Sequence, residues 1–171
     1  MQKKLLIVTV ILTFLVGFGY WEFDQLGGNN PVVIQLVNKK PESLLGNTFI
    51  GIPQDTQLAK MFEETLTQKS LKTGTFLHTI YEIEPAGKLD TMKVFVGINQ
   101  LLPEEGFELK TFEEDRYLLA IITGSSWVMP GPKTIKAELE KYAAENNLKL
   151  TGIFIDKIIR EDEVHVIAPI Q

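Results

Sequence analysis

Apolar residues follow two different spacings along residues 32–171, and each spacing predicts one kind of element. Short segments rich in β-branched residues and bounded by Gly, Pro, Asn or acidic residues predict strands. These segments are residues 32–37, 48–52, 74–83, 91–98, 107–111, 117–123, 152–159 and 163–170. Two longer segments carry apolar residues three and four positions apart and predict amphipathic helices. Their apolar stripes are Leu58, Met61, Phe62 and Leu66 in the first, and Ile135, Leu139, Tyr142 and Ala143 in the second.

The second half of the chain repeats the first. Residues 73–80 read TGTFLHTI and residues 151–158 read TGIFIDKI, so Thr, Gly, Phe and Ile recur in register. Two copies are too few for a solenoid, which favours a duplicated unit that closes on itself. The predicted fold class is α+β, with a duplicated strand-helix-strand-strand unit that forms one antiparallel sheet with two helices on one face. We assign repeat one to residues 32–100 and repeat two to residues 105–171.

An uncharged segment at residues 5–21 precedes this domain. As a helix it would be roughly 25 Å long, at the short end of what crosses a bilayer. Tyr20 and Trp21 fall where an interfacial aromatic belt is expected. The sequence therefore predicts a transmembrane anchor at residues 1–24 and a linker at residues 25–31.

Two features bear on the location that this anchor implies. Lys3 and Lys4 precede the apolar segment, which places the N-terminus inside by the positive-inside rule. The expected location is thus the cytoplasmic membrane, single-pass, with the domain outside. A cleaved signal peptide is the alternative, although Gly17-Phe18-Gly19 matches a cleavage site poorly.

Composition excludes several classes of function. The formal net charge of -5 argues against nucleic-acid binding, which needs clustered Lys and Arg. The chain has no cysteine, so disulfides, thiolate metal sites and cysteine nucleophiles are ruled out. Ser125-Ser126 lacks the G-x-S-x-G elbow of a hydrolase nucleophile, and the two histidines have no acid-rich helix near them in sequence. We therefore expect no metal and no cofactor, and no catalytic residue can be assigned.

Alternation along the strands groups the residues of the two octapeptides by face. Leu77 and Ile155 suit packing under the helices, so the other face is expected to line a cleft. That face carries Phe76, His78 and Ile80 in the first copy and Phe154, Asp156 and Ile158 in the second. His78 and Asp156 hold equivalent positions and are expected to face each other across a pseudo-two-fold axis, either as a ligand site or as a structural pair.

Two aromatic residues outside this set have open roles. Trp127 lies in a loop rich in Gly, Ser and Pro, where it either stacks on a ligand at the cleft mouth or caps the core. Tyr81 alternates with His78 and is expected in the core unless a bulge turns it.

The order of elements resembles the GyrI-like effector-binding family. The resemblance covers about residues 32–171 and rests on Gly74 to Tyr81 followed by residues 92–98, and on Gly152 to Asp156 followed by residues 164–170. It implies a cleft between the repeats that holds a bulky, often aromatic and cationic molecule. It also implies that the cleft carboxylate is Asp156, where the family commonly has Glu. The family's DNA-binding helix-turn-helix is absent.

These observations predict a membrane-anchored module that holds a bulky hydrophobic or aromatic small molecule. The predicted ligand-binding residues are Phe76, His78, Trp127, Phe154 and Asp156. One alternative is a hydrolase of electrophilic natural products with Asp156 as general base, helped by His78. Another is a domain that binds an envelope protein. The expected partners are thus the small molecule, the membrane through residues 5–21 and, in the last case, a protein.

Overall fold

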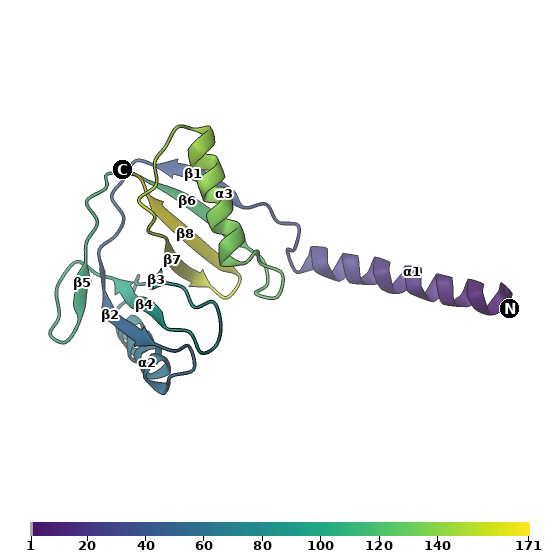
Figure 1. The fold of residues 1–171 in the computed structure, drawn as a ribbon, viewed down its shortest axis with the longest axis horizontal. Coiled ribbons are helices and arrows are strands. Elements are labelled where there is room, and N and C mark those ends of the chain that lie inside the picture. Colours follow the sequence, from purple (N-terminus) through teal and green to yellow (C-terminus); the bar gives the residue numbers. More distant parts are fainter. Residues whose placement is uncertain (1) are drawn as a thin grey trace.

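The computed structural model describes residues 2–171, and for residues 2–11 and 14 only the course of the helix. In chain order the elements are α1 (Gln2–Gln25), β1 (Val33–Val37), β2 (Leu44–Gly51), α2 (Thr56–Leu71), β3 (Leu77–Ile83), β4 (Met92–Asn99), β5 (Glu108–Lys110), β6 (Tyr117–Thr123), α3 (Pro132–Glu145), β7 (Ile155–Arg160) and β8 (Glu163–Pro169). The strands form one antiparallel sheet in the order β1-β6-β8-β7-β3-β4-β2-β5 (Figure 1). The predicted α+β class with a single antiparallel sheet is confirmed.

The strand order is symmetric about the β3–β7 pair. Strands β1 to β4 of the first half correspond to β5 to β8 of the second. When each strand is replaced by its counterpart, the result is the same order read from the other edge of the sheet. The outermost strands are exchanged between the halves, because β1 pairs with β6 and β5 pairs with β2. Each half therefore completes the sheet of the other.

Local signals explain where the two domain helices begin and end. Asp55 precedes α2, and its side chain accepts a hydrogen bond from the Gln57 backbone N–H at 2.8 Å. Pro132 occupies the first turn of α3, where its missing N–H costs nothing. After α3, Asn147 adopts a left-handed conformation with φ of 55°.

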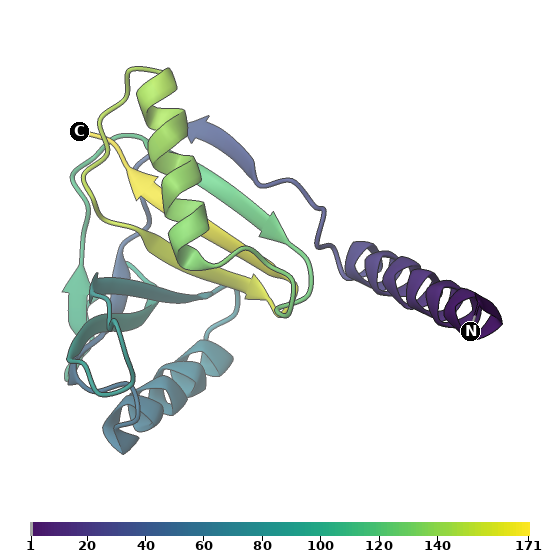
Figure 2. The ribbon, with the colours of Figure 1, turned by 45° about the vertical axis from the view of Figure 1, so that its right-hand side comes forward.

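Helices α2 and α3 cover the same face of the sheet (Figures 1 and 2). Asp156 and Ile158 are two residues apart on β7, and Val166 of β8 lies opposite Asp156, so all three side chains share a face. Ile158 packs against the α2 cluster and Val166 belongs to the α3 cluster. The two helices thus stand side by side on one face, each over its own half.

The face of the sheet under the helices carries two core clusters, and the other face carries a third. Under α3 the buried residues are Leu118, Ala120, Ile122, Ile135, Leu139, Ala143, Val166, Ala168 and Ile170. Under α2 they are Phe49, Met61, Leu77, Met92, Val94 and Val96. A third cluster on the other face consists of Leu44, Ile80, Phe95, Ile155 and Ile167, against which Phe112, Tyr117 and Leu119 pack.

Helix α1 projects away from the sheet (Figure 1). Its described apolar side chains run from Leu12 to Phe23, and Glu22 and Asp24 carry charge at its C-terminal end. Among the described side chains, no helix is long and apolar enough to span a membrane.

This finding corrects the predicted location. A single-pass arrangement in the cytoplasmic membrane, with the N-terminus inside and the domain outside, is contradicted. The anchor predicted at residues 1–24 is not supported, and in its uncharged segment, residues 5–21, the side chains of residues 5–11 and 14 lie outside the described part of the chain.

Leu139→Ala is expected to lower the free energy of unfolding by about 3 kcal/mol or more, because the fully buried leucine ties α3 to the sheet and its loss leaves a cavity. Urea denaturation followed by circular dichroism measures the change. Leu101→Ala, at a side chain that is 78% exposed, is the control and should change stability by less than about 0.5 kcal/mol. Equal losses for the two variants would contradict the assignment of the core.

Candidate functional site

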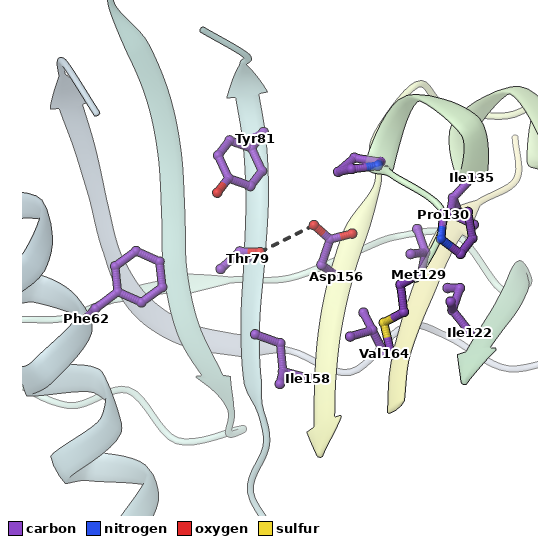
Figure 3. Close-up of a pocket in the computed structure, with 12 residues that line it drawn as sticks. Phe62, Thr79, Tyr81, Ile122, Met129, Pro130, Ile135, Asp156, Ile158 and Val164 are labelled. Carbon is purple, nitrogen blue, oxygen red and sulfur yellow. Dashed lines mark hydrogen bonds between the residues drawn. The ribbon is translucent and has the colours of Figure 1, made fainter. Parts of the chain in front are cut away.

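A groove runs between α2 and α3 above the centre of the sheet. Its cavity has a volume of about 340 Å³, in the range of small-molecule sites. The walls are almost wholly apolar and come from both helices, from β3, β6, β7 and β8 and from the segment before α3 (Figure 3). The lining residues are Phe62, Thr79, Tyr81, Ile122, Met129, Pro130, Pro132, Ile135, Asp156, Ile158, Val164 and Val166.

The polar centre of the groove is formed by Asp156 and Thr79. The two residues are direct partners in the β3–β7 ladder, and the Thr79 hydroxyl donates a long hydrogen bond of 3.5 Å to Asp156 Oδ2. Figure 3 shows the two side chains directed toward each other from neighbouring strands. The groove thus has one hydrogen-bonded carboxyl group in an apolar enclosure.

Burial raises the pKa of the Asp156 carboxyl to about 6. The charge of Lys136 and the hydrogen bond from Thr79 oppose this rise, and the negative charge of Glu84 adds to it. The phenol of Tyr81 responds to the same site, because burial and the charge of Asp156 both raise its pKa. Asp156 therefore changes its protonation state close to neutral pH.

The groove continues outward from Tyr81. A second cavity of about 420 Å³ is lined by Tyr81, Glu84, Pro85, Gly131, Pro132 and Lys133. Tyr81 and Pro132 border both cavities, so the two form one groove with an inner and an outer part. At this end Lys136 of α3 forms an ion pair with Glu84, which follows β3.

His78 lies on the opposite face of the sheet from Asp156. Its side chain is only 1% exposed, and its Nδ1 is 2.9 Å from the carbonyl oxygen of Phe76. Burial lowers its pKa to about 4, so the ring is neutral at neutral pH. In the described part of the protein its Nε2 has no hydrogen-bond partner. The structure does not bring His78 to Asp156.

A shift of one residue between the repeats explains this difference. Both central strands contain a register shift, between Tyr81 and Ile83 in β3 and between Ile158 and Arg160 in β7. Counted along the chain, the separation between these two register shifts is one residue less than the separation between the two octapeptides. By this measure the structural counterpart of Asp156 is Thr79, its ladder partner. A one-residue offset moves a side chain to the other face, which is where His78 lies.

The same offset separates the two predicted phenylalanines. Phe76 lies on the face of His78, with Lys157 Nζ 4.7 Å from its ring centre, and Lys157 forms a 2.6 Å ion pair with Glu42. Phe154 lies on the helix side, partly buried against the α3 core. Neither ring lines the groove. Of the five residues predicted to bind a ligand, only Asp156 lines the groove between the helices.

Trp127 is 90% exposed in the loop before α3. It does not cap the core, and its side chain lines neither part of the groove. Met129 and Pro130, two and three residues later, do line it. Trp127 thus lies near the groove in sequence and outside it in the structure.

Sequence reasoning missed Thr79 and Tyr81, which contribute to the groove. Tyr81 was expected in the core, yet it is 38% exposed and borders both cavities. The signal that could have identified the pair is the alternation of β3 itself, read from Leu77 as the buried residue under α2. Among the described side chains, no group of three His, Cys, Asp or Glu residues could hold a metal ion.

No protein-family model matches the sequence, and no curated protein is detectably similar to it. Solved structures share its fold. A hydrolase from Listeria innocua aligns with a TM-score of 0.56 and 9% identity over 81% of this chain and 91% of its own. The EcmrR C-terminal domain aligns with a TM-score of 0.52 and 12% identity over 82% of this chain and 97% of its own.

EcmrR in its complex with DNA aligns over 99% of this chain and 70% of its own, with a TM-score of 0.55 and 12% identity. Identities this low establish the fold and no more. At that level the EcmrR matches agree with the predicted α+β fold. The candidate site residues are therefore assigned from the structure of this chain.

Asp156→Asn is expected to affect stability more favourably at pH 7 than at pH 4. The pKa of Asp156 in the folded state is about 6, above its ordinary value of 3.8. The wild-type protein therefore loses stability as the pH rises from about 4 to about 6, whereas the amide of Asn does not ionise and causes no such loss. The difference between the two pH values should be on the order of 2 kcal/mol. Urea denaturation of both proteins at pH 4 and pH 7 measures it.

Asp90→Asn, at an exposed turn residue, is the matched control and should behave alike at both pH values. A pH-independent effect of Asp156→Asn would show that the carboxyl group titrates normally.

Proposed function

We propose that this protein binds a bulky hydrophobic or aromatic small molecule in the groove between α2 and α3. The observation that carries the proposal is an apolar cavity that contains one buried carboxyl group at its centre. Small-molecule sites are typically apolar with a few placed polar groups, and Asp156 with Thr79 supplies these. The shared fold with the EcmrR C-terminal domain supports an effector-binding role of the GyrI-like kind.

The groove suits a ligand with two or three rings. Tyr81 stands between the inner and outer parts, where its exposed ring can contact a planar group in either. Phe62, Met129 and Ile158 contribute further apolar surface to the inner part. Asp156 accepts a hydrogen bond from a ligand when ionised and donates one when protonated, so it orients the ligand in both states.

Binding of the neutral dye Nile red to the full chain tests the proposal. Fluorescence is expected to rise on binding, and Tyr81→Ala should weaken binding roughly tenfold because a ring-sized apolar contact is lost. Ile83→Ala is the control, since Ile83 is exposed on the same strand and borders neither cavity. The absence of binding, or equal effects of the two substitutions, would refute a ligand site in this groove.

A hydrolase is the second candidate, and one observation favours it. Asp156 has a pKa of about 6 in an apolar enclosure, which suits a general base at neutral pH. A fold neighbour is a hydrolase, but the fold alone does not define an activity. In this alternative the Asp156 carboxylate directs a water molecule onto an electrophilic ligand in the groove.

A single-turnover assay with an aromatic epoxide distinguishes the two. Hydrolysis should rise with pH through about 6 as Asp156 ionises, and Asp156→Asn should abolish it. Binding without hydrolysis above the buffer rate would leave the binding function and exclude the enzyme.

A further inference from the structure

Lys136 interacts with both carboxylates that border the groove, Glu84 and Asp156. Its ammonium group pairs with Glu84 across the outer end of the groove and sits 5.0 Å from the centre of the Phe154 ring. It also exerts the largest opposing effect on the pKa of Asp156. The residue before it, Ile135, lines the inner cavity, so Lys136 stands at the groove's edge on α3.

This placement is held by packing as well as by charge. The side chain of Lys136 is 26% exposed, which means that its aliphatic stem lies largely against the protein. The Phe154 ring and Glu84 fix the ammonium group from two directions. Lys136 therefore places a fixed positive charge at the edge of the groove.

This positive charge changes which ligands the groove favours. The carboxylates of Asp156 and Glu84 would attract a cationic ligand, but part of their charge is already balanced by Lys136. A ligand cation close to Asp156 would also experience repulsion from the ammonium group. An uncharged ligand of the same shape experiences neither effect, so the charge of Lys136 acts selectively.

We propose that Lys136 sets the charge selectivity of the groove by lowering its affinity for cationic aromatic ligands relative to uncharged ones of the same shape. The inference rests on the proposed binding function and names the residue that decides the ligand class. It assigns Lys136 a role in specificity, while Asp156 and Tyr81 supply the contacts.

Two probes of nearly equal shape test the inference. Methyltriphenylphosphonium is a cation and triphenylphosphine oxide is uncharged, and each carries three phenyl rings. Isothermal titration calorimetry of the full chain gives the ratio of their affinities. In Lys136→Met the ratio should shift toward the phosphonium ion by at least about fivefold, because a like charge near the site is removed.

Two control variants isolate this effect. Lys141→Met removes the same charge from an exposed position of α3 that borders neither cavity, so the ratio should change by less than about twofold. Lys136→Arg keeps the charge and should retain the wild-type ratio. A loosened loop at Glu84 would weaken both probes alike and leave the ratio unaffected.

The outcomes separate the inference from the proposed function. If the wild-type protein binds the phosphine oxide but Lys136→Met leaves the ratio unchanged, or shifts it no more than Lys141→Met, the role of Lys136 is refuted and the binding function stands. If neither probe binds any variant, while Nile red also fails to bind, both are refuted.

Discussion

The pairing of β3 with β7 is the interaction on which the rest of the structure depends. It joins the two halves at the centre of the sheet, and its register decides which side chains enter the space between the helices. In that register Thr79 and Asp156 meet in the groove, while His78 and Lys157 meet on the other face. A slip of one residue would pair Asp156 with His78 or Thr79 with Lys157, so the carboxyl group and the hydroxyl group would lie on opposite faces of the sheet.

A near-symmetric frame thus encloses an asymmetric site. The two halves contribute equivalent strands and helices, but Thr79 and Asp156 at equivalent places differ in charge. Surrounding apolar walls make the carboxyl group sensitive to its few neighbours, since charges interact more strongly away from water. Lys136 and Glu84 are the charged neighbours that act on it. The chemistry of the groove therefore depends on a small number of residues placed on a common scaffold.

Much of the fold could be predicted because it is encoded locally. Strand alternation, helical stripes and caps such as Asp55 act over a few residues, and the elements they predict are present. Asp156 was predicted as a site residue from the repeat and the family resemblance, and it lines the groove. The phase of β3 follows from Leu77, which packs under α2 as predicted, but the phase of β7 was predicted wrongly, because Ile155 is equally apolar and yet packs on the other face. The octapeptide match therefore suggested His78 where the structure has Thr79.

The exchanged outer strands have a consequence for how the molecule is built. The boundary between the repeats in sequence is not a boundary in space, because β1 closes the half that contains β6 and β5 closes the half that contains β2. A chain cut between the repeats would leave each piece with an unpaired sheet edge and a strand that belongs elsewhere. Most pairings thus join distant parts of the chain, and such topologies fold slowly. Neither repeat forms a complete part of the sheet without a strand from the other.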